Sequence, residues 1–460
     1  MLAESPRATP CRAVRVLGDI FAASRLVLGN MKRLLPKGEF GRNVLTVLSG
    51  TTIAQAIPVA ISPILTRLYT PADLGVLALY VSIISIAVVV ATGRYELAIL
   101  LPRRDREAFD ILVVAVGLAL FVSAIALLLV FVFRAPLVAQ FSGSATVGLW
   151  LYALPFSVLM TALYQSLAYW NNRKKHYSRL AVSKVGQSGA MCSAQVGAGM
   201  ANAGSSGLIG GYVLGQLAAN GMLLRATWAE ARVRLKQCTV ARLCAVARKH
   251  RSFPTFMIPG HLANVASSQM PVLLLSLLYG PHIAGFYSLA ERVLVLPSSI
   301  IGSAIGDVYR QQAALAYQAT GNCRELFLRT AKKLAVIALI PLIAAVAAGP
   351  WLFSVLFGPV WREAGEVTAL IGAMVFFQIV SSPLSQTVLL AHMQRLDLLW
   401  QIVRLALSVG SIYAGFFLAH DYRVSIVLYV ISFSLLYLAH SFLQYRAACG
   451  YPSHEPTVDA

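Results

Sequence analysis

Charged side chains are scarce in this sequence, and acidic ones are the scarcest. Asp, Glu, Lys and Arg make up 12% of the 460 residues, with only 18 acidic residues in total. Soluble globular domains carry about twice this charged fraction. Hydrophobic residues account for 58%, and the mean hydropathy is +0.71. The composition therefore excludes a soluble protein and indicates one that crosses a membrane several times.

The sequence also lacks the motifs of common enzyme classes. It has no Walker-type phosphate loop, no zinc-protease motif and no nucleophile elbow. Its six cysteines have no metal-ligand spacing, and no histidine is placed to complete a zinc site. The net charge of +20 comes from short basic segments between apolar runs, which membrane topology explains without a nucleic-acid partner. We therefore expect no enzyme, no cofactor, no metal site and no nucleic-acid binding.

Twelve apolar runs are long enough to cross a membrane, since a spanning helix needs about 20 residues. The runs are 44–66, 74–100, 108–133, 147–169, 178–200, 206–224, 253–279, 283–305, 333–357, 366–391, 396–418 and 424–445. The fifth and sixth are rich in Gly, Ser and Ala, which suits closely packed helices. We predict an all-α integral membrane protein with 12 transmembrane helices.

The distribution of Lys and Arg predicts the orientation of these helices. Segments on one side of the membrane hold 31 of the 38 basic residues, and loops on the other side hold only 4. Basic residues are retained on the cytoplasmic side. We therefore predict that both termini are cytoplasmic.

A short motif occurs twice, 210 positions apart. The segments 68–79 and 278–289 share Leu, Tyr, Pro, Gly and Leu at the same places. Pro fixes the backbone and Gly permits close approach, so both suit a corner between two helices. The corner residues are Tyr69, Pro71 and Gly75 in the first copy, and Tyr279, Pro281 and Gly285 in the second.

The repeat predicts a duplicated protein. Six spans precede the basic segment 225–252 and six follow it, so the two halves enter the membrane from the same side and form parallel repeats. We predict two six-helix lobes around a central cavity, 44–224 and 253–445, joined by the cytoplasmic linker 225–252. Residues 446–460 form a cytoplasmic tail. Residues 1–43 form a basic cytoplasmic segment, of which 1–30 lie outside the protein if translation starts at Met31.

Charges inside apolar runs are costly and by default mark a function. Arg94 and Glu96 fall within the run 74–100. They are two residues apart and would not share a helix face, so each would need a partner on another helix. The alternative is that the helix stops at Gly93, which leaves both charges in a loop. Glu291 and Arg292 lie inside the eighth run, where adjacent positions point about 100° apart, so they too would need partners elsewhere. They would either form a structural pair between helices or line the central cavity.

Lys184 and Arg404 fall at matching depths on corresponding helices of the two halves. One interpretation is that both line the central cavity; the other is that both extend to the cytoplasmic interface. We predict Arg94, Lys184, Arg292 and Arg404 as cavity cations that bind substrate. Glu96 and Glu291 are predicted as their charge partners or as a site for a coupling ion.

Three segments resemble bacterial polysaccharide flippases of the multidrug/oligosaccharidyl-lipid/polysaccharide exporter superfamily. They are KRLLPKGEFGRNVLT at 32–46, LTRLYTP at 65–71 and RYELAI at 94–99. The resemblance is specific over residues 31–102 and extends as a general layout to the last span. Residues 1–30 fall outside it.

The resemblance implies that the protein lies in the bacterial cytoplasmic (inner) membrane and flips undecaprenyl-diphosphate-linked oligosaccharide across it for O-antigen or exopolysaccharide biosynthesis. Its partners would be the lipid-linked oligosaccharide and membrane lipid, together with a polysaccharide polymerase and chain-length proteins. Two alternatives remain open at this point. One is a multidrug exporter of the same superfamily, and the other is a non-transporting scaffold for a polysaccharide assembly complex. The sugar, the coupling ion and the oligomeric state do not follow from the sequence.

Overall fold

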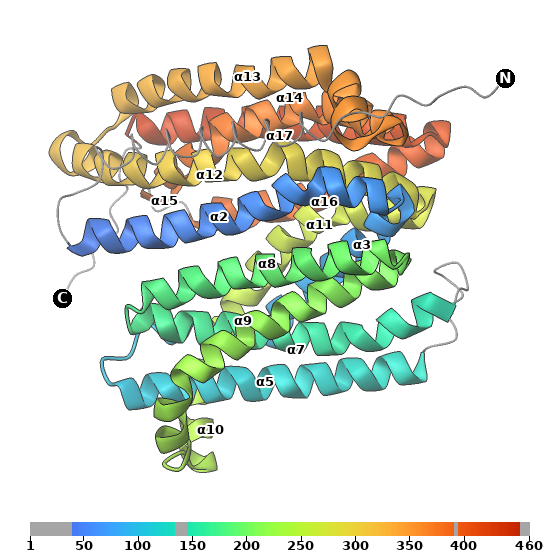
Figure 1. The fold of residues 1–460 in the computed structure, drawn as a ribbon. Helices are drawn as coiled ribbons and strands as arrows, with labels where there is room; N and C mark the ends of the chain where they lie inside the picture. The colour runs from blue at the N-terminus through green and yellow to red at the C-terminus, as the bar shows by residue number, and fades with distance from the viewer. Residues whose placement is uncertain (1–38, 134–144, 391–393, 451–460) are drawn as a thin grey trace.

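The structure is a computed structural model that describes residues 39–133, 145–390 and 394–450, and the described chain is helical throughout (Figure 1). Among the residues that the structure describes, the first half contains six long helices. These are α2 (Glu39–Leu68), α3 (Pro71–Ala91), α5 (Asp105–Val132), α7 (Ala145–Arg173), α8 (Tyr177–Met200) and α9 (Gly204–Leu235), with the short α4 (Tyr95–Ala98) between α3 and α5.

The second half also contains six long helices. These are α11 (Ile258–Tyr279), α12 (Pro281–Thr320), α13 (Arg324–Phe357), α14 (Arg362–Leu384), α16 (Gln394–Ala419) and α17 (Tyr422–Ala448). Shorter elements lie between them: α10 (Val240–Lys249), the π-helical turn η1 (Phe253–Met257), the 3-10 turn η2 (Pro359–Trp361) and α15 (Gln386–Leu390).

The prediction of an all-helical membrane protein is confirmed. Within the described residues, nine helices are long and apolar enough to cross a membrane. The three other long helices are α2, α8 and α12, and each overlaps one of the predicted spans. The count of twelve spans and the cytoplasmic location of both termini stay predictions.

Two helix boundaries differ from those that the apolar runs predicted. The second helix does not extend over the whole run 74–100, because α3 ends at Ala91. The segment 225–252 is largely helical, since α9 continues to Leu235 and α10 follows. The apolar run of the sixth span ends at residue 224, but α9 continues as a helix to Leu235. Hydropathy alone therefore placed the end of this helix too early. Nearly all of the basic segment 1–43, including Met31, lies outside the described residues.

The same helix pairs pack in both halves. In the first half α2 packs on α8, α8 on α9, α9 on α7, and α7 on α5. The equivalent pairs of the second half are α11 with α16, α16 with α17, α17 with α14, and α14 with α13. Figure 1 shows these groups as two bundles, which we call the N-lobe and the C-lobe. The lobes meet mainly where α3 packs along both α11 and α12.

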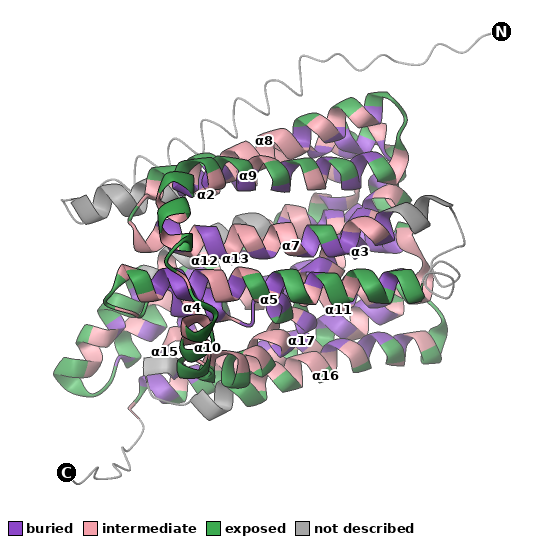
Figure 2. Ribbon diagram, turned by 90° about the horizontal axis from the view of Figure 1, so that it is seen from below, coloured by how far each residue is buried: buried purple, intermediate pink, exposed green. Residues whose placement is uncertain are grey.

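Opposite ends of the bundle differ in character. The corners that begin α3 and α12 lie at one end, which we call the corner end. α10 projects from the other end, the linker end (Figure 1). None of its residues is buried, and Figure 2 shows it mostly in the exposed colour. By the distribution of Lys and Arg, the linker end is the predicted cytoplasmic side.

Candidate translocation site between the lobes

The two copies of the corner motif contact each other. Pro71 and Pro281 begin α3 and α12. A Cβ atom on Gly75 would lie 1.7 Å from the carbonyl oxygen of Pro281, and one on Gly285 would lie 1.9 Å from that of Pro71. The contact is reciprocal, as expected when equivalent residues of a repeat meet near a two-fold axis. Glycine is required at both positions because no side chain fits between the backbones.

Other buried contacts extend this meeting point. The indole Nε1 of Trp361 donates a hydrogen bond to the carbonyl oxygen of Thr66 on α2, at 3.0 Å. Trp361 is 1% exposed and packs edge-to-face on Phe286, with ring centroids 6.0 Å apart. We call the contacts among Thr66, Pro71, Gly75, Pro281, Gly285 and Trp361 the corner seam. The corner seam joins the lobes at the corner end.

Tyr69 and Tyr279 hold each corner to its own lobe. The hydroxyl of Tyr69 donates to the carbonyl oxygen of Gln195 on α8, at 2.6 Å. The hydroxyl of Tyr279 lies 2.6 Å from Oγ of Ser425 on α17. Each tyrosine therefore ties the corner to a helix near the end of its own half, which explains why the repeat retains both Tyr and Pro at this turn.

Arg94 and Glu96 lie in a break after α3. Gly93 and Arg94 both have a φ of 58°, a left-handed conformation that ends the helix. The guanidinium Nη1 of Arg94 is 3.1 Å from Oε1 of Glu96, whose side chain is fully buried. The prediction that each charge seeks a partner on another helix is therefore wrong. It assumed a continuous helix, in which residues two apart face different directions.

The Arg94–Glu96 pair is not fully satisfied by its own hydrogen bond. Nε of Arg94 and Oε2 of Glu96 are buried without a partner among the described residues. Arg94 also lies within electrostatic range of His261 on α11. The pair therefore sits beside the other lobe, and it retains hydrogen-bonding capacity for a ligand or water.

Glu291 and Arg292 point in different directions from the middle of α12. Glu291 lies within electrostatic range of Tyr287 and of Tyr429 on α17, so it faces into the C-lobe. Arg292 lies within electrostatic range of Cys192 on α8, so it faces the N-lobe. Both side chains are half-buried. Neither forms an ion pair with another residue in the described part of the chain.

Lys184 and Arg404 each bind neutral polar groups. Nζ of Lys184 donates to Oγ1 of Thr51 on α2, at 3.2 Å. Nη1 of Arg404 donates to Oδ1 of Asn264 on α11, at 2.9 Å, and to Oε1 of Gln401 at 3.2 Å. Thr51 and Asn264 belong to the first helix of their lobes, so the matched positions make matched contacts. Among the described residues, no carboxylate neutralises either cation.

Sequence reasoning missed the aromatic and amide groups around these charges. Tyr429 lies within electrostatic range of both Glu291 and Arg404, and Tyr437 lies within range of Arg404. The two tyrosines are eight residues apart in the span 424–445, which places them on one helix face. That spacing was a usable signal. No sequence pattern could have identified the role of Asn264, because a single amide in an apolar run does not reveal its partner.

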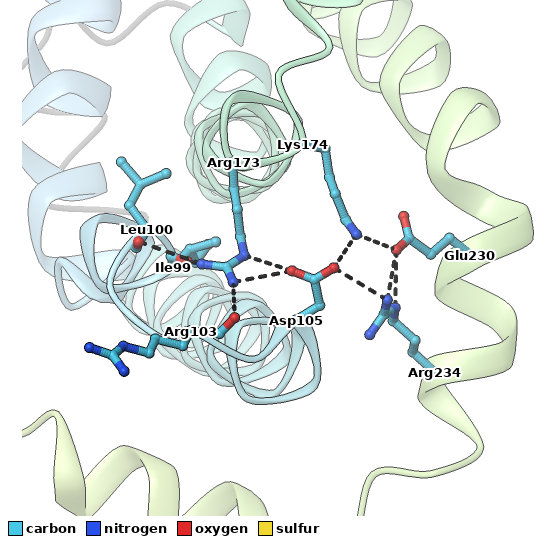
Figure 3. Close-up of polar contacts among 8 residues, drawn as sticks. All are labelled: Ile99, Leu100, Arg103, Asp105, Arg173, Lys174, Glu230 and Arg234. Carbon is cyan, nitrogen blue, oxygen red and sulfur yellow. Dashed lines mark hydrogen bonds and ion pairs between the residues drawn. The ribbon is translucent and has the colours of Figure 1, made fainter.

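A separate polar network lies at the linker end of the N-lobe (Figure 3). Asp105, at the start of α5, pairs with Arg173 at 3.1 Å and with Lys174. Glu230 on α9 pairs with Lys174 at 3.1 Å and with Arg234 at 3.0 Å. Burial opposes the charged form of Lys174, but its hydrogen bonds to Asp105 and Glu230 outweigh burial, and its pKa is raised. The network joins α5, α7 and α9.

Comparison with known proteins identifies the fold and the family. No curated protein matches the sequence. The lipid II flippase MurJ in an inward closed conformation matches with a TM-score of 0.64 and 8% identity, over 86% of each chain. An inward-facing multidrug resistance MATE transporter of the MOP superfamily matches with a TM-score of 0.56 and 13% identity, over 87% of this chain and 93% of that one.

A third solved structure is a MOP superfamily transporter from Pyrococcus furiosus, described as having a binding pocket of reverse polarity. It matches with a TM-score of 0.54 and 11% identity, over 89% of this chain and 95% of that one. At these identities the likenesses establish the fold. The sequence model of the family described as polysaccharide biosynthesis protein matches residues 64–366. Because this match covers more than half of the chain, the protein belongs to the polysaccharide biosynthesis protein family and has the fold of the MATE and MurJ transporters.

Proposed function

We propose that the protein flips undecaprenyl-diphosphate-linked oligosaccharide repeat units across the bacterial inner membrane by alternating access. The repeat units would serve O-antigen or exopolysaccharide biosynthesis, with a polymerase and chain-length proteins acting on them afterwards. The substrate would enter from the linker end, the predicted cytoplasmic side, and leave at the corner end. The protein would act as a transporter and not as an enzyme.

The charge balance of the site carries this proposal. Of the four predicted cavity cations, only Arg94 has a carboxylate partner among the described residues. Lys184 and Arg404 bind neutral groups. Arg292 faces the opposite lobe and forms no ion pair with the residues that the structure describes. Unneutralised cations inside a membrane are costly unless they face water or bind an anion. A diphosphate supplies that anion, and arginine binds phosphate oxygens in a bidentate manner.

The contacts between the lobes support a lipid-linked substrate. α3 packs along α11 and α12, but the equivalent contact of α2 with α12 is sparse. The lobes are therefore less tightly joined on the α2 side. A polyprenyl tail on that side could stay in lipid while the diphosphate and sugars occupy the polar interior, so the tail would not have to cross a packed interface.

The test is export by alanine variants of Arg292 and Arg94 in a deletion strain. We expect each variant to lower polysaccharide export at least about tenfold, because a charge-assisted bond to phosphate is lost. Membrane levels should stay normal. Arg329→Ala is the matched control, since Arg329 is exposed and, among the described residues, pairs only with Glu325 on its own helix. Full export by both cavity variants would overturn the proposed binding role.

Glu96 and Glu291 would have different roles in this scheme. Glu96 would hold Arg94 in place in the empty state, because the two are directly paired. Glu291, which faces tyrosines of the C-lobe, would be the candidate site for a coupling ion. A Glu291→Gln variant that binds substrate normally but no longer responds to the ion gradient would support this division.

Two other functions make different predictions. A multidrug exporter of the same fold would confer drug resistance, but cationic drugs are poorly suited to a site with unneutralised cations. A scaffold without transport activity would leave the orientation of lipid-linked repeat units unchanged. In a deletion strain, accumulation of these units on the cytoplasmic leaflet would therefore distinguish a flippase from a scaffold.

A further inference from the structure

A second basic site lies at the linker end, where α10 packs on α5. It is a cavity of about 370 Å³. One wall is the connection between α4 and α5, residues 101–104, and the other is formed by Glu107, Lys249 and His250. We call this cavity the linker pocket. None of the residues considered for the translocation site lines it.

The first wall of the linker pocket, residues 101–104, is held in place by Arg173 at the end of α7. One guanidinium, that of Arg173, donates to the carbonyl oxygens of Ile99 at 3.1 Å and of Arg103 at 3.4 Å. It also pairs with Asp105. Figure 3 shows the side chain of Arg103 directed away from this network. These contacts fix the backbone of the loop, and they leave the guanidinium group of Arg103 available to bind a ligand.

The opposite wall is fixed by the docking of α10 on α5. Arg242 pairs with the buried Asp110, and the hydroxyl of Tyr95 donates to the carbonyl oxygen of Ala247 at 3.0 Å. Lys249 pairs with Glu107 at 2.6 Å. Both walls are thus built before any ligand binds, which lowers the entropic cost of binding.

The linker pocket is positively charged. Arg103, Arg104 and Lys249 carry three cations against the single carboxylate of Glu107, a formal net charge of +2 with His250 neutral. Glu107 is already paired with Lys249. Arg103 and Arg104 are exposed, and neither forms an ion pair with any residue that the structure describes. Two free guanidinium groups at one cavity suit a phosphate, which they can bind with paired hydrogen bonds.

Apolar residues adjoin the arginines on the same loop. Leu100 is 43% exposed and Leu101 is 62% exposed, directly before Pro102 and Arg103. Exposed leucines beside arginines are suited to the boundary between acyl chains and headgroups. Basic pockets on the cytoplasmic side of membrane helices bind lipid headgroups in this way.

We infer that the linker pocket binds the phosphate group of a lipid headgroup at the predicted cytoplasmic membrane surface, with Arg103 and Arg104 as its ligands. The inference concerns binding and does not depend on transport. The same chemistry could be presented by a polyprenyl diphosphate carrier or by an anionic phospholipid, so the experiment must distinguish these two sources.

The experiment measures lipid binding to the full chain in detergent by native mass spectrometry. The probes are undecaprenyl diphosphate and phosphatidylglycerol, each with and without inorganic pyrophosphate as competitor. The test variant is Arg103→Gln with Arg104→Gln. The matched control is Arg106→Gln with Arg251→Gln, which removes two nearby exposed charges that do not line the pocket.

We expect the test variant to weaken binding of at least one lipid about 30-fold, because it removes both guanidinium groups that bind the phosphate directly. The control should change binding by less than about twofold. Displacement by pyrophosphate would support recognition of the phosphate itself. The lipid that loses affinity identifies the source. Equal binding by the two double variants, or no competition by pyrophosphate, would overturn the inference.

Discussion

Gly75→Ala is the substitution that tests the corner seam most directly. The added Cβ would lie 1.7 Å from the carbonyl oxygen of Pro281, whereas real contacts of this kind stay at 3.0 Å or more. The α3 and α12 backbones would therefore have to separate by about 1.3 Å, since close-packed backbone cannot absorb the overlap. Overpacking of this kind costs about 1–3 kcal/mol. The substitution therefore destabilises the state in which the corners touch, and it leaves the free energy of a state with separated corners unchanged.

The expected result is a shift in the population of closed and open corners. A difference of 1–3 kcal/mol changes their ratio by about 5- to 150-fold. Spin labels at Ala72 and His282, which are both exposed and lie on opposite sides of the seam, would report the separation by double electron–electron resonance. The labels require a background in which the reactive native cysteines are replaced by serine.

Gly117→Ala is the matched control. A Cβ on Gly117, in α5, meets nothing within 4 Å, and alanine favours the helix more than glycine does. We expect Gly75→Ala to gain a longer-distance population and Gly117→Ala to match the parent. If the two variants give the same distance distribution with normal folding, the corner seam does not control the separation of the lobes.

Two further predictions concern side chains at opposite ends of the molecule. Trp361→Phe keeps a ring against Phe286 but removes the hydrogen bond to Thr66. It should therefore destabilise the closed corner seam by about 1 kcal/mol, and an unchanged distance between the spin labels at Ala72 and His282 would contradict this. Asp105→Asn should lower the free energy of unfolding by only about 1 kcal/mol, because the carboxylate is 41% exposed and solvent screens its pairs. Its melting temperature, compared with that of Glu325→Gln as an exposed control, checks the second prediction.

Much of the fold could be predicted because hydropathy and the motif repeat are strong signals. The corner motif indicated two equivalent turns, and α3 and α12 do begin at its two prolines. The sequence could not indicate that the two copies touch. Contact between Gly75 and Pro281 depends on how the lobes pack, and a repeat is compatible with copies that lie far apart.

The candidate site was harder to predict than the fold. Arg94 and Glu96 were identified as important charges, but their pairing depends on the left-handed turn at Gly93 and Arg94. A left-handed arginine has no clear sequence signal, because non-glycine residues adopt this conformation only when the surroundings require it. The partners of Lys184 and Arg404 are likewise single Thr and Asn residues, which side-chain chemistry alone does not single out.

If the lobes move against each other as the proposed function requires, the attachment of α10 determines where the chain bends. α10 is bonded to α5 through Arg242 and Lys249, so it travels with the N-lobe as part of one rigid body. The mechanical joint is then much shorter than the linker 225–252. It reduces to the residues between the end of α10 at Lys249 and the start of α11 at Ile258, which include the π-helical turn Phe253–Met257. π-Helical turns are rare and frequently lie at functional sites, so this turn is the place where we expect the chain to bend.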